Sequence, residues 1–237
     1  MQKILGTLFL SGAFAAGAAQ AHYLWIEADN AGAKLYYGEA DALLKEKSPG
    51  KLDNFQAPKA YVQASANAKP AETDIKRGAQ YFSIAVPKKT AAVLVTEESM
   101  EVKDLSKHKL GLAKSNYYAR EGHPAASADN ALPLDVLASA PNHLTVLYRG
   151  QPLKGAKVEV IAPNTWVQEH KTNAQGNIEI NTPWRGQYVV HVLYVDATPG
   201  EFAGKKYESL RNHFTYTFVR KAGAYAGPAV PPKHMED

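Results

Sequence analysis

The residue with the clearest chemical potential is His22, because of what stands before it. Ala19-Gln20-Ala21 is the small-residue pattern that signal peptidase recognises, and cleavage after Ala21 would make His22 the first residue of the mature chain. An amino-terminal histidine offers its α-amine and its imidazole together, and such nitrogen donors suit copper and nickel. A second histidine from elsewhere would complete a T-shaped histidine brace. The alternative is that His22 follows the cleavage site by chance, because the peptidase accepts many residues there.

Residues 1–21 have the features of a secretory signal peptide. Lys3 supplies a positive charge, and residues 4–18 are a stretch of apolar and small residues. Beyond residue 21, no apolar run approaches the roughly 18 residues that suggest a membrane span. We therefore expect an exported protein with no membrane span after cleavage, located in the periplasm if the host is Gram-negative.

Two histidines in the second half are candidates for further ligands. In the expected strand 213–218, aromatic residues alternate with His213 and two threonines, so His213 lies on the polar face. In the expected strand 186–194, His191 lies among valine and leucine side chains. If these strands are neighbours in a sheet, the two histidines converge, and imidazole suits copper, nickel and zinc. The alternatives are a surface histidine at 213 and a hydrogen-bonded core histidine at 191.

Glu201 stands in the loop between those two strands and is the remaining candidate ligand. It could bind an ion directly or accept a hydrogen bond that orients a histidine ring. The alternative is a solvated loop carboxylate. Four other histidines have no partner at suitable spacing on a shared face, and we expect them at the surface: His108, His123, His143 and His170.

The composition excludes several classes of protein. The chain has 237 residues, of which 45% are hydrophobic and 21% charged, with a formal net charge of +4 and no cysteine. Without cysteine there is no disulfide, thiol catalysis or thiolate metal site, so a transition metal must bind histidine, methionine, carboxylates or the amino terminus. No nucleic-acid-binding pattern is present, and neither are the common hydrolase, metalloprotease or phosphate-loop motifs. We therefore expect a binding protein with no catalytic residues and no nucleic-acid partner.

Short runs of β-branched and aromatic residues, separated by turn-forming residues, predict an all-β protein. About seven such runs after residue 142 are typical of an immunoglobulin-like sandwich. The segment 121–142 is rich in alanine and proline and is interpreted as a linker with one short strand. We therefore expect two β-sandwich units, an amino-terminal β domain over 22–140 and an immunoglobulin- or transthyretin-like domain over 141–221. Residues 222–237 have no pattern, and we expect a disordered tail.

Several motifs resemble known families. The segment HYLWIE is similar to the opening of a bacterial periplasmic family, and YRGQPLKGAKVEVI, KTNAQGNIEI and GQYVVHV resemble transthyretin-like and collagen-adhesin-B-type modules. The segment DATPGEFAGKKYESLRNHFTYTF resembles the carboxy-terminal signature of the family called domain of unknown function 4198. Many members of that family are associated with nickel and cobalt uptake. The resemblance extends over nearly the whole mature chain and implies a periplasmic, two-part β-sandwich protein that handles divalent transition metals.

Three functional hypotheses follow. The first is a periplasmic protein that binds nickel, cobalt or copper through His22 and His213, with His191 and Glu201 as further candidates, and that receives or delivers the ion for an inner-membrane transporter. Because the ligands must lose protons to bind, its affinity should fall below about pH 6.5. The second is a β-sandwich adaptor that binds a protein or glycan partner without a metal. The third is a copper oxidase or polysaccharide monooxygenase with the same amino-terminal histidine.

Overall fold

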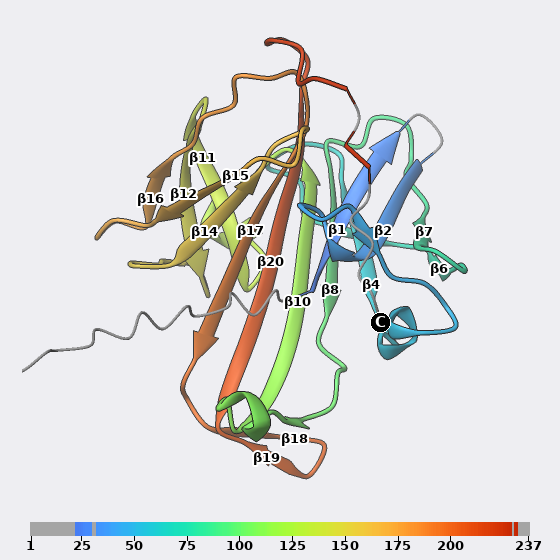
Figure 1. Cartoon of the computed structure of the whole chain (residues 1–237), viewed down its shortest axis with the longest axis vertical. Helices are drawn as coiled ribbons and strands as arrows, with labels where there is room; N and C mark the ends of the chain where they lie inside the picture. Colours follow the sequence, from blue (N-terminus) through green and yellow to red (C-terminus); the bar gives the residue numbers. More distant parts are fainter. Residues whose placement is uncertain (1–21, 30–31, 229, 232–237) are drawn as a thin grey trace, which may run out of the picture.

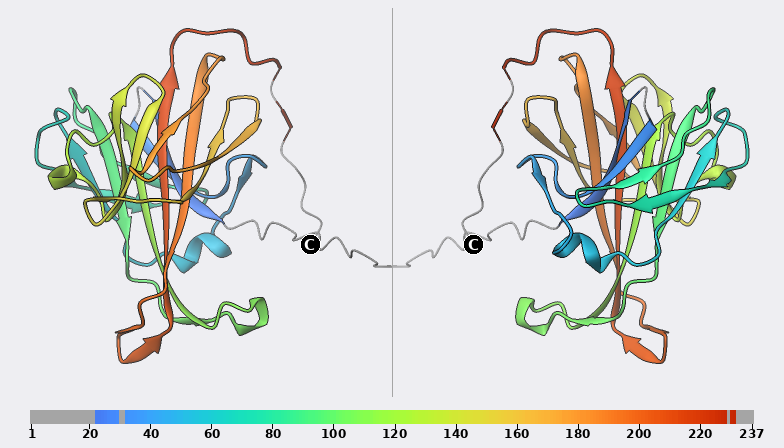
Figure 2. Two further views of the ribbon diagram at one scale, coloured as in Figure 1. Left: turned by 90° about the vertical axis from the view of Figure 1, so that its left-hand side faces the viewer. Right: turned by 90° about the vertical axis from the view of Figure 1, so that its right-hand side faces the viewer.

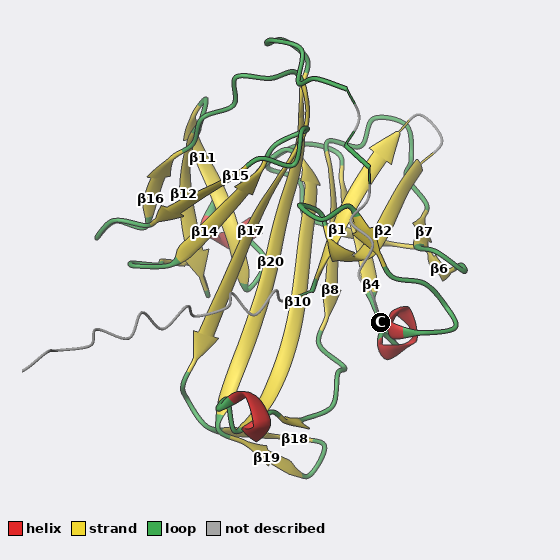
Figure 3. Cartoon of the chain, viewed as in Figure 1, coloured by secondary structure: helices red, strands yellow, loops and turns green. Residues whose placement is uncertain are grey.

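The structure is a computed structural model that describes residues 22–29, 32–228 and 230–231. The expected signal peptide and the end of the expected tail lie outside these residues. Within them the protein is nearly all β, as predicted, and the only helices are three short 3-10 segments: η1 (Lys51–Asn54), η2 (Ser106–His108) and η3 (Ala128–Asn130) (Figure 3). No helix in the described part of the chain is long and apolar enough to cross a membrane.

A nine-stranded sheet forms the middle of the molecule (Figure 1). Its strand order is β15-β14-β17-β20-β10-β8-β4-β5, and β9 pairs with β10. The strands are β4 (Lys59–Gln63), β5 (Ala71–Thr73), β8 (Ala92–Glu97), β9 (Lys103–Asp104), β10 (Leu112–Gly122), β14 (Lys157–Ile161), β15 (Val167–Lys171), β17 (Gly186–Asp196) and β20 (Ser209–Arg220). Each pair is antiparallel except β10 with β20, which run parallel.

A smaller sheet covers each face of this central sheet. One contains β11 (Leu134–Ala140), β12 (His143–Tyr148), β13 (Gln151–Pro152) and β16 (Asn177–Glu179). The other contains β1 (Tyr23–Asp29), β2 (Gly32–Glu39), β3 (Leu44–Lys45), β6 (Ile75–Arg77) and β7 (Phe82–Ile84). Figure 1 shows β11, β12 and β16 on the left of β17, β20 and β10, and β1, β2 and β7 on the right. The predicted sandwich architecture is thus present, and the two sandwiches share the central sheet.

Alternating side chains of the central strands enter two different cores. In β8, Leu94 packs in the core beneath β11 and β12, whereas Val93 and Val95 pack in the core beneath β1 and β2. In β10, Tyr118 packs in the core beneath β11 and β12, and Tyr117 packs in the core beneath β1 and β2. Because side chains of successive strand residues point to opposite faces, a strand buried on both sides is a continuous apolar run. Burying each large apolar side chain contributes roughly 1.5–3 kcal/mol, so both cores hold the central sheet in place.

The central sheet contains strands from both sides of the expected domain boundary near residue 140. β10 comes before that boundary and β20 long after it, yet they pair in parallel over nine registered positions, from Ala113–Ser209 to Glu121–Thr217. The two predicted units therefore share a sheet. The long connection between β10 and β20 includes β11, which lies in the segment expected to be a linker.

The ends of the long strands carry the remaining elements. The hairpin of β18 (Gly200–Phe202) and β19 (Lys205–Tyr207) lies beyond the lower ends of β17 and β20, clear of both smaller sheets (Figure 2). Part of the expected tail is hydrogen-bonded to the rest of the protein. The amide of Ala224 donates a hydrogen bond to the carbonyl of Pro183 at 2.9 Å. Residues 229 and 232–237 lie outside the described part of the chain.

Candidate metal centre

Two of the predicted ligands, His191 and His213, lie together on the central sheet. In the register of β17 and β20, His191 is opposite Thr215 and His213 is opposite Leu193, so the two histidines are diagonal neighbours on one face. Their ring centroids are 6.2 Å apart, and the ring planes differ by 16°. The sequence therefore predicted their convergence correctly.

Two tyrosines enclose this pair of rings. The ring of Tyr23 from β1 stacks on His191 with centroids 4.1 Å apart, and the ring of Tyr117 from β10 stacks on His213 at 4.6 Å. His191 is 6% exposed and His213 is 3% exposed. The histidines therefore lie in an aromatic layer between β1 and the central sheet, shielded from bulk water.

One nitrogen of His191 is held by a carboxylate, and the other has no hydrogen-bond partner within residues 22–29, 32–228 and 230–231. Glu159, the register partner of His191 on β14, has its Oε2 3.1 Å from His191 Nδ1. This hydrogen bond, together with that from Lys157, lowers the pKa of Glu159 to about 2 against the opposing effect of burial. His191 Nε2 is buried and has no hydrogen-bond partner among the described residues. A carboxylate on one nitrogen of a histidine ring is the usual way in which proteins orient the other nitrogen toward a metal.

His213 is a neutral, buried base. Its Nδ1 is buried and also has no hydrogen-bond partner among the described residues. Burial lowers the pKa of His213 well below its ordinary value, and the electrostatic interactions with His191 and Arg211 act in the same direction. A neutral imidazole keeps a lone pair at neutral pH, which is the form that binds metal ions.

The polar face of β20 is not exposed, contrary to what its threonines suggested. Thr215 and Thr217 are buried like His213, because the sheet of β1 and β2 covers this face. Thr215 Oγ1 donates a hydrogen bond to the carbonyl oxygen of Leu24 in β1 at 2.7 Å. Thr215 therefore binds β1, which the sequence of β20 alone could not indicate.

This hydrogen bond holds the start of β1 against β20. His22 precedes β1 by one residue and Leu24 by two. β1 and β20 both run toward the top of Figure 1. A chain cleaved after Ala21 would therefore begin two residues before the contact between β1 and β20.

The imidazole of His22 has a different environment from its main-chain nitrogen. Its Nδ1 lies 3.0 Å from Glu39 Oε1, and its Nε2 lies 2.6 Å from Glu46 Oε1. Burial raises the pKa of Glu39, and hydrogen bonds from Lys51 and His22 lower that of Glu46 in spite of burial. The other oxygen of Glu39, Oε2, is buried without a hydrogen-bond partner in the described structure. An ion that binds His22 Nδ1 would have to compete with the carboxylate of Glu39.

Glu201, the fourth predicted ligand, lies on the β18–β19 hairpin. Its register partner is Lys206, and its side chain is exposed. Across the described residues, no group of three or more histidine, cysteine, aspartate or glutamate side chains is arranged to hold a metal ion. The side chains of the candidate centre are thus a pair of histidines, and any third donor has to come from elsewhere, such as the amino terminus.

Sequence reasoning missed three carboxylates: Glu39, Glu46 and Glu159. A signal for Glu159 exists in KVEVI, where the acid alternates with Val158 and Val160 and so lies on the face opposite to them. Of the four histidines expected at the surface, His143 is exposed, with Glu179 4.0 Å away. His170 is only partly exposed, and its Nε2 is buried.

The chain belongs to the family described as Domain of unknown function (DUF4198), which matches residues 19–196. The family predicted from the sequence is thereby confirmed, although the segment 196–218, interpreted as its carboxy-terminal signature, lies almost wholly beyond the matched residues. No curated protein and no solved structure matches the chain.

Proposed function

We propose that this protein binds one nickel, cobalt or copper ion between His191, His213 and the amino terminus at His22, and that it carries the ion in the periplasm to or from a transporter. One observation carries the proposal: two neighbouring buried histidines each keep one ring nitrogen without a hydrogen-bond partner in the described part of the chain. Buried polar atoms are nearly always hydrogen-bonded, so two adjacent exceptions call for a bound species.

The donor set favours late divalent transition metals. Imidazole and amine nitrogens suit copper, nickel and cobalt, whereas calcium and magnesium require oxygen ligands. Metal–nitrogen bonds are about 2.0–2.1 Å long, so a ring bound through one nitrogen has its centroid roughly 3 Å from the ion. The centroids of His191 and His213 are 6.2 Å apart, which is within the separation that two rings sharing one ion can have. In this proposal Glu159 orients His191, and the amine of His22 supplies a third nitrogen.

Binding and release are a better account of this centre than oxidation of a large substrate. His191 and His213 are nearly inaccessible to solvent. An oxidase that acts on polysaccharides would need its ion on an open face. Exposed aromatic residues, Trp166 and Tyr225, favour the adaptor hypothesis only weakly, because Trp166 meets Trp184 edge to face and not as a flat platform.

The test is a calorimetric titration of the mature protein with Cu(II), Ni(II) and Co(II), after intact mass has established that it begins at His22. We expect one ion to bind more tightly than about micromolar, or roughly −8 kcal/mol. Binding should be lost in His191→Gln and His213→Gln and weakened by one glycine added before His22. His143→Gln is the matched control, because that histidine is exposed.

The outcomes separate the hypotheses. Binding that needs both histidines but not the free amine would remove His22 from the centre. Absence of binding by correctly processed protein would overturn the metal hypothesis and favour the adaptor.

A further inference from the structure

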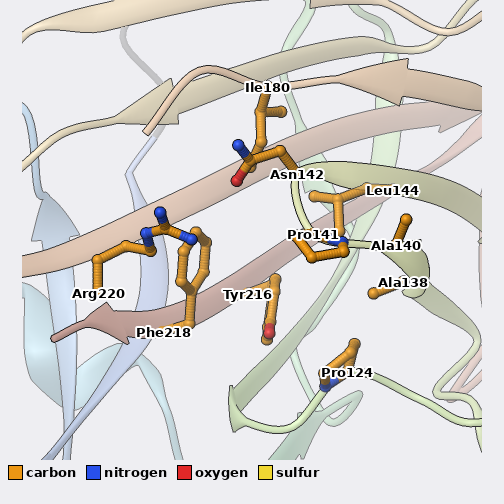
Figure 4. Close-up of a pocket in the computed structure, with 10 residues that line it drawn as sticks. All are labelled: Pro124, Ala138, Ala140, Pro141, Asn142, Leu144, Ile180, Tyr216, Phe218 and Arg220. Atoms are coloured by element: carbon orange, nitrogen blue, oxygen red, sulfur yellow. The ribbon is translucent and has the colours of Figure 1, made fainter. Parts of the chain in front are cut away.

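A second candidate site lies on the opposite face of the central sheet. A pocket of about 280 Å³ opens between the β11–β12 hairpin, the segment that follows β16 and the last residues of β20 (Figure 4). Tyr216, Phe218 and Arg220 contribute from β20, on the face that packs against β11 and β12, whereas His213 is on the other face. This pocket is therefore separate from the histidine pair.

The walls of the pocket are apolar and stiff. Tyr216 and Phe218 stack with centroids 5.2 Å apart and planes within 25°, and they present a continuous aromatic surface. Pro124 and Pro141 contribute rigid rings, and Leu144 contributes an aliphatic side chain. Such a surface fits a flat hydrophobic group, and the volume is near the lower end for small-molecule sites.

The polar groups at the pocket are hydrogen-bond donors. Arg220 lines it, and its Nε is buried without a hydrogen-bond partner among the described residues. Asn142 accepts a hydrogen bond from Thr182 Oγ1 at 2.9 Å through its oxygen, so its NH₂ remains to be donated. The hydroxyl of Tyr216 is already donated to the carbonyl of Gly122 at 3.1 Å. Of the residues that the structure describes, no aspartate or glutamate lines the pocket.

We propose that this pocket binds a small aromatic monocarboxylate, with its ring against Tyr216 and Phe218 and its carboxylate on Arg220. In Figure 4 Arg220 lies beside Phe218, on the side of the pocket away from Ala138 and Ala140. The charged end of the pocket is thus separate from its apolar end. In an aryl carboxylate the charged carboxylate is likewise separate from the apolar ring. A guanidinium pairs with a carboxylate through two parallel hydrogen bonds, which its buried and unpartnered Nε favours.

The experiment uses benzoate and 2-naphthoate as probes, with benzamide and 2-naphthamide as neutral counterparts of the same shape. Binding is followed by chemical-shift changes in two-dimensional NMR spectra of the labelled mature protein. We expect both acids to shift resonances of Tyr216, Phe218 and Leu144, and 2-naphthoate to bind more tightly. The amides should bind at least tenfold more weakly, because a hydrogen-bonded charge pair is lost.

Variants decide which residues carry the binding. Arg220→Gln should weaken binding of the acids at least tenfold and leave that of the amides unchanged, and Arg220→Lys should restore part of the loss. Arg185→Gln removes the same charge from an exposed arginine that stacks on Tyr225, and it should change nothing. Ala138→Phe should fill the pocket and weaken binding of acids and amides together.

Three results would overturn the proposal. These are equal affinities for acid and amide, unchanged binding in a folded Arg220→Gln protein, or chemical-shift changes confined to residues away from the pocket. Thermal unfolding of each variant establishes that a loss of binding is not a loss of fold. Failure of metal binding would leave these results unaffected, since the two sites use different residues on opposite faces.

Discussion

Arg120 and Asp135 form a fully buried ion pair between the central sheet and the sheet of β11 and β12. Arg120 Nη2 lies 2.6 Å from Asp135 Oδ2, and Arg120 Nε lies 2.9 Å from Oδ1. The guanidinium also donates to Gln63 Oε1 at 2.9 Å, and the carboxylate accepts the amide hydrogens of Leu132 and Val136. Arg120 lies near the end of β10 and Asp135 near the start of β11, so this pair fixes how the segment expected to be a linker packs.

Breaking this pair should destabilise the protein severely. Asp135→Asn leaves the Arg120 guanidinium buried with an uncompensated charge, and we expect the free energy of unfolding to fall by about 3–5 kcal/mol. The measurement is unfolding in urea followed by tryptophan fluorescence. Glu101→Gln removes a carboxylate from the exposed pair with Lys205 and serves as the control, with no measurable change expected. Stability of Asp135→Asn equal to that of the natural chain would contradict this account.

His213 should make stability depend on pH near neutrality. Its pKa in the folded protein is well below the ordinary value of about 6.5, so the unfolded chain binds a proton that the folded chain does not. Stability contributed by the neutral ring is therefore present above about pH 6.5 and is lost as the pH falls below it. We expect His213→Gln to flatten this loss in urea titrations of the metal-free protein between about pH 8 and 5. His143→Gln should keep the slope of the natural chain, and identical slopes for all three proteins would rule out the effect.

Glu159 should support metal binding without touching the ion. Glu159→Gln replaces the carboxylate on His191 Nδ1 by an amide, which orients the ring less well and makes it less basic. We expect metal affinity to fall about 10–100-fold, as measured by competition with a coloured chelator. Glu169→Gln is a close control, because Glu169 is the register partner of Glu159 on β15 and shares its ion pair with Lys157. Equal losses in the two variants would show that the effect comes from the shared lysine.

Alternation within single strands was predictable from the sequence. It placed Phe214, Tyr216 and Phe218 on one face of the last strand, and the structure buries Phe214 and Tyr216 in one core and packs Phe218 against it. This feature depends on residues close in sequence, and the period of a strand alone determines it. The pairing of the strands that carry His191 and His213 was only a condition in the sequence analysis, and the structure shows that pairing.

The environment of His213 was not predictable in this way. Thr215 and Thr217 made its face look solvated, but β1 covers that face from nearly 200 residues away in the chain. The parallel pairing of β10 with β20 is equally non-local. The one sequence signal was the uninterrupted apolar run from Tyr23 to Ile26, which is typical of a strand buried on both sides.

Thr215 should act as a positioning residue for the amino terminus. Thr215→Val keeps the shape of the side chain but removes the donor to the carbonyl of Leu24, so that carbonyl is left buried without this hydrogen bond. We expect the free energy of unfolding to fall by about 1–3 kcal/mol. The amine of His22 should also be held less firmly, so metal affinity should fall while His191 and His213 remain in place.

The comparison that decides the matter uses protein with one glycine added before His22, in which the amine has already moved. Thr215→Val should weaken metal binding in the natural mature chain and have little further effect in the extended one. An equal loss in both backgrounds would mean that Thr215 acts through the histidine pair and not through the amino terminus.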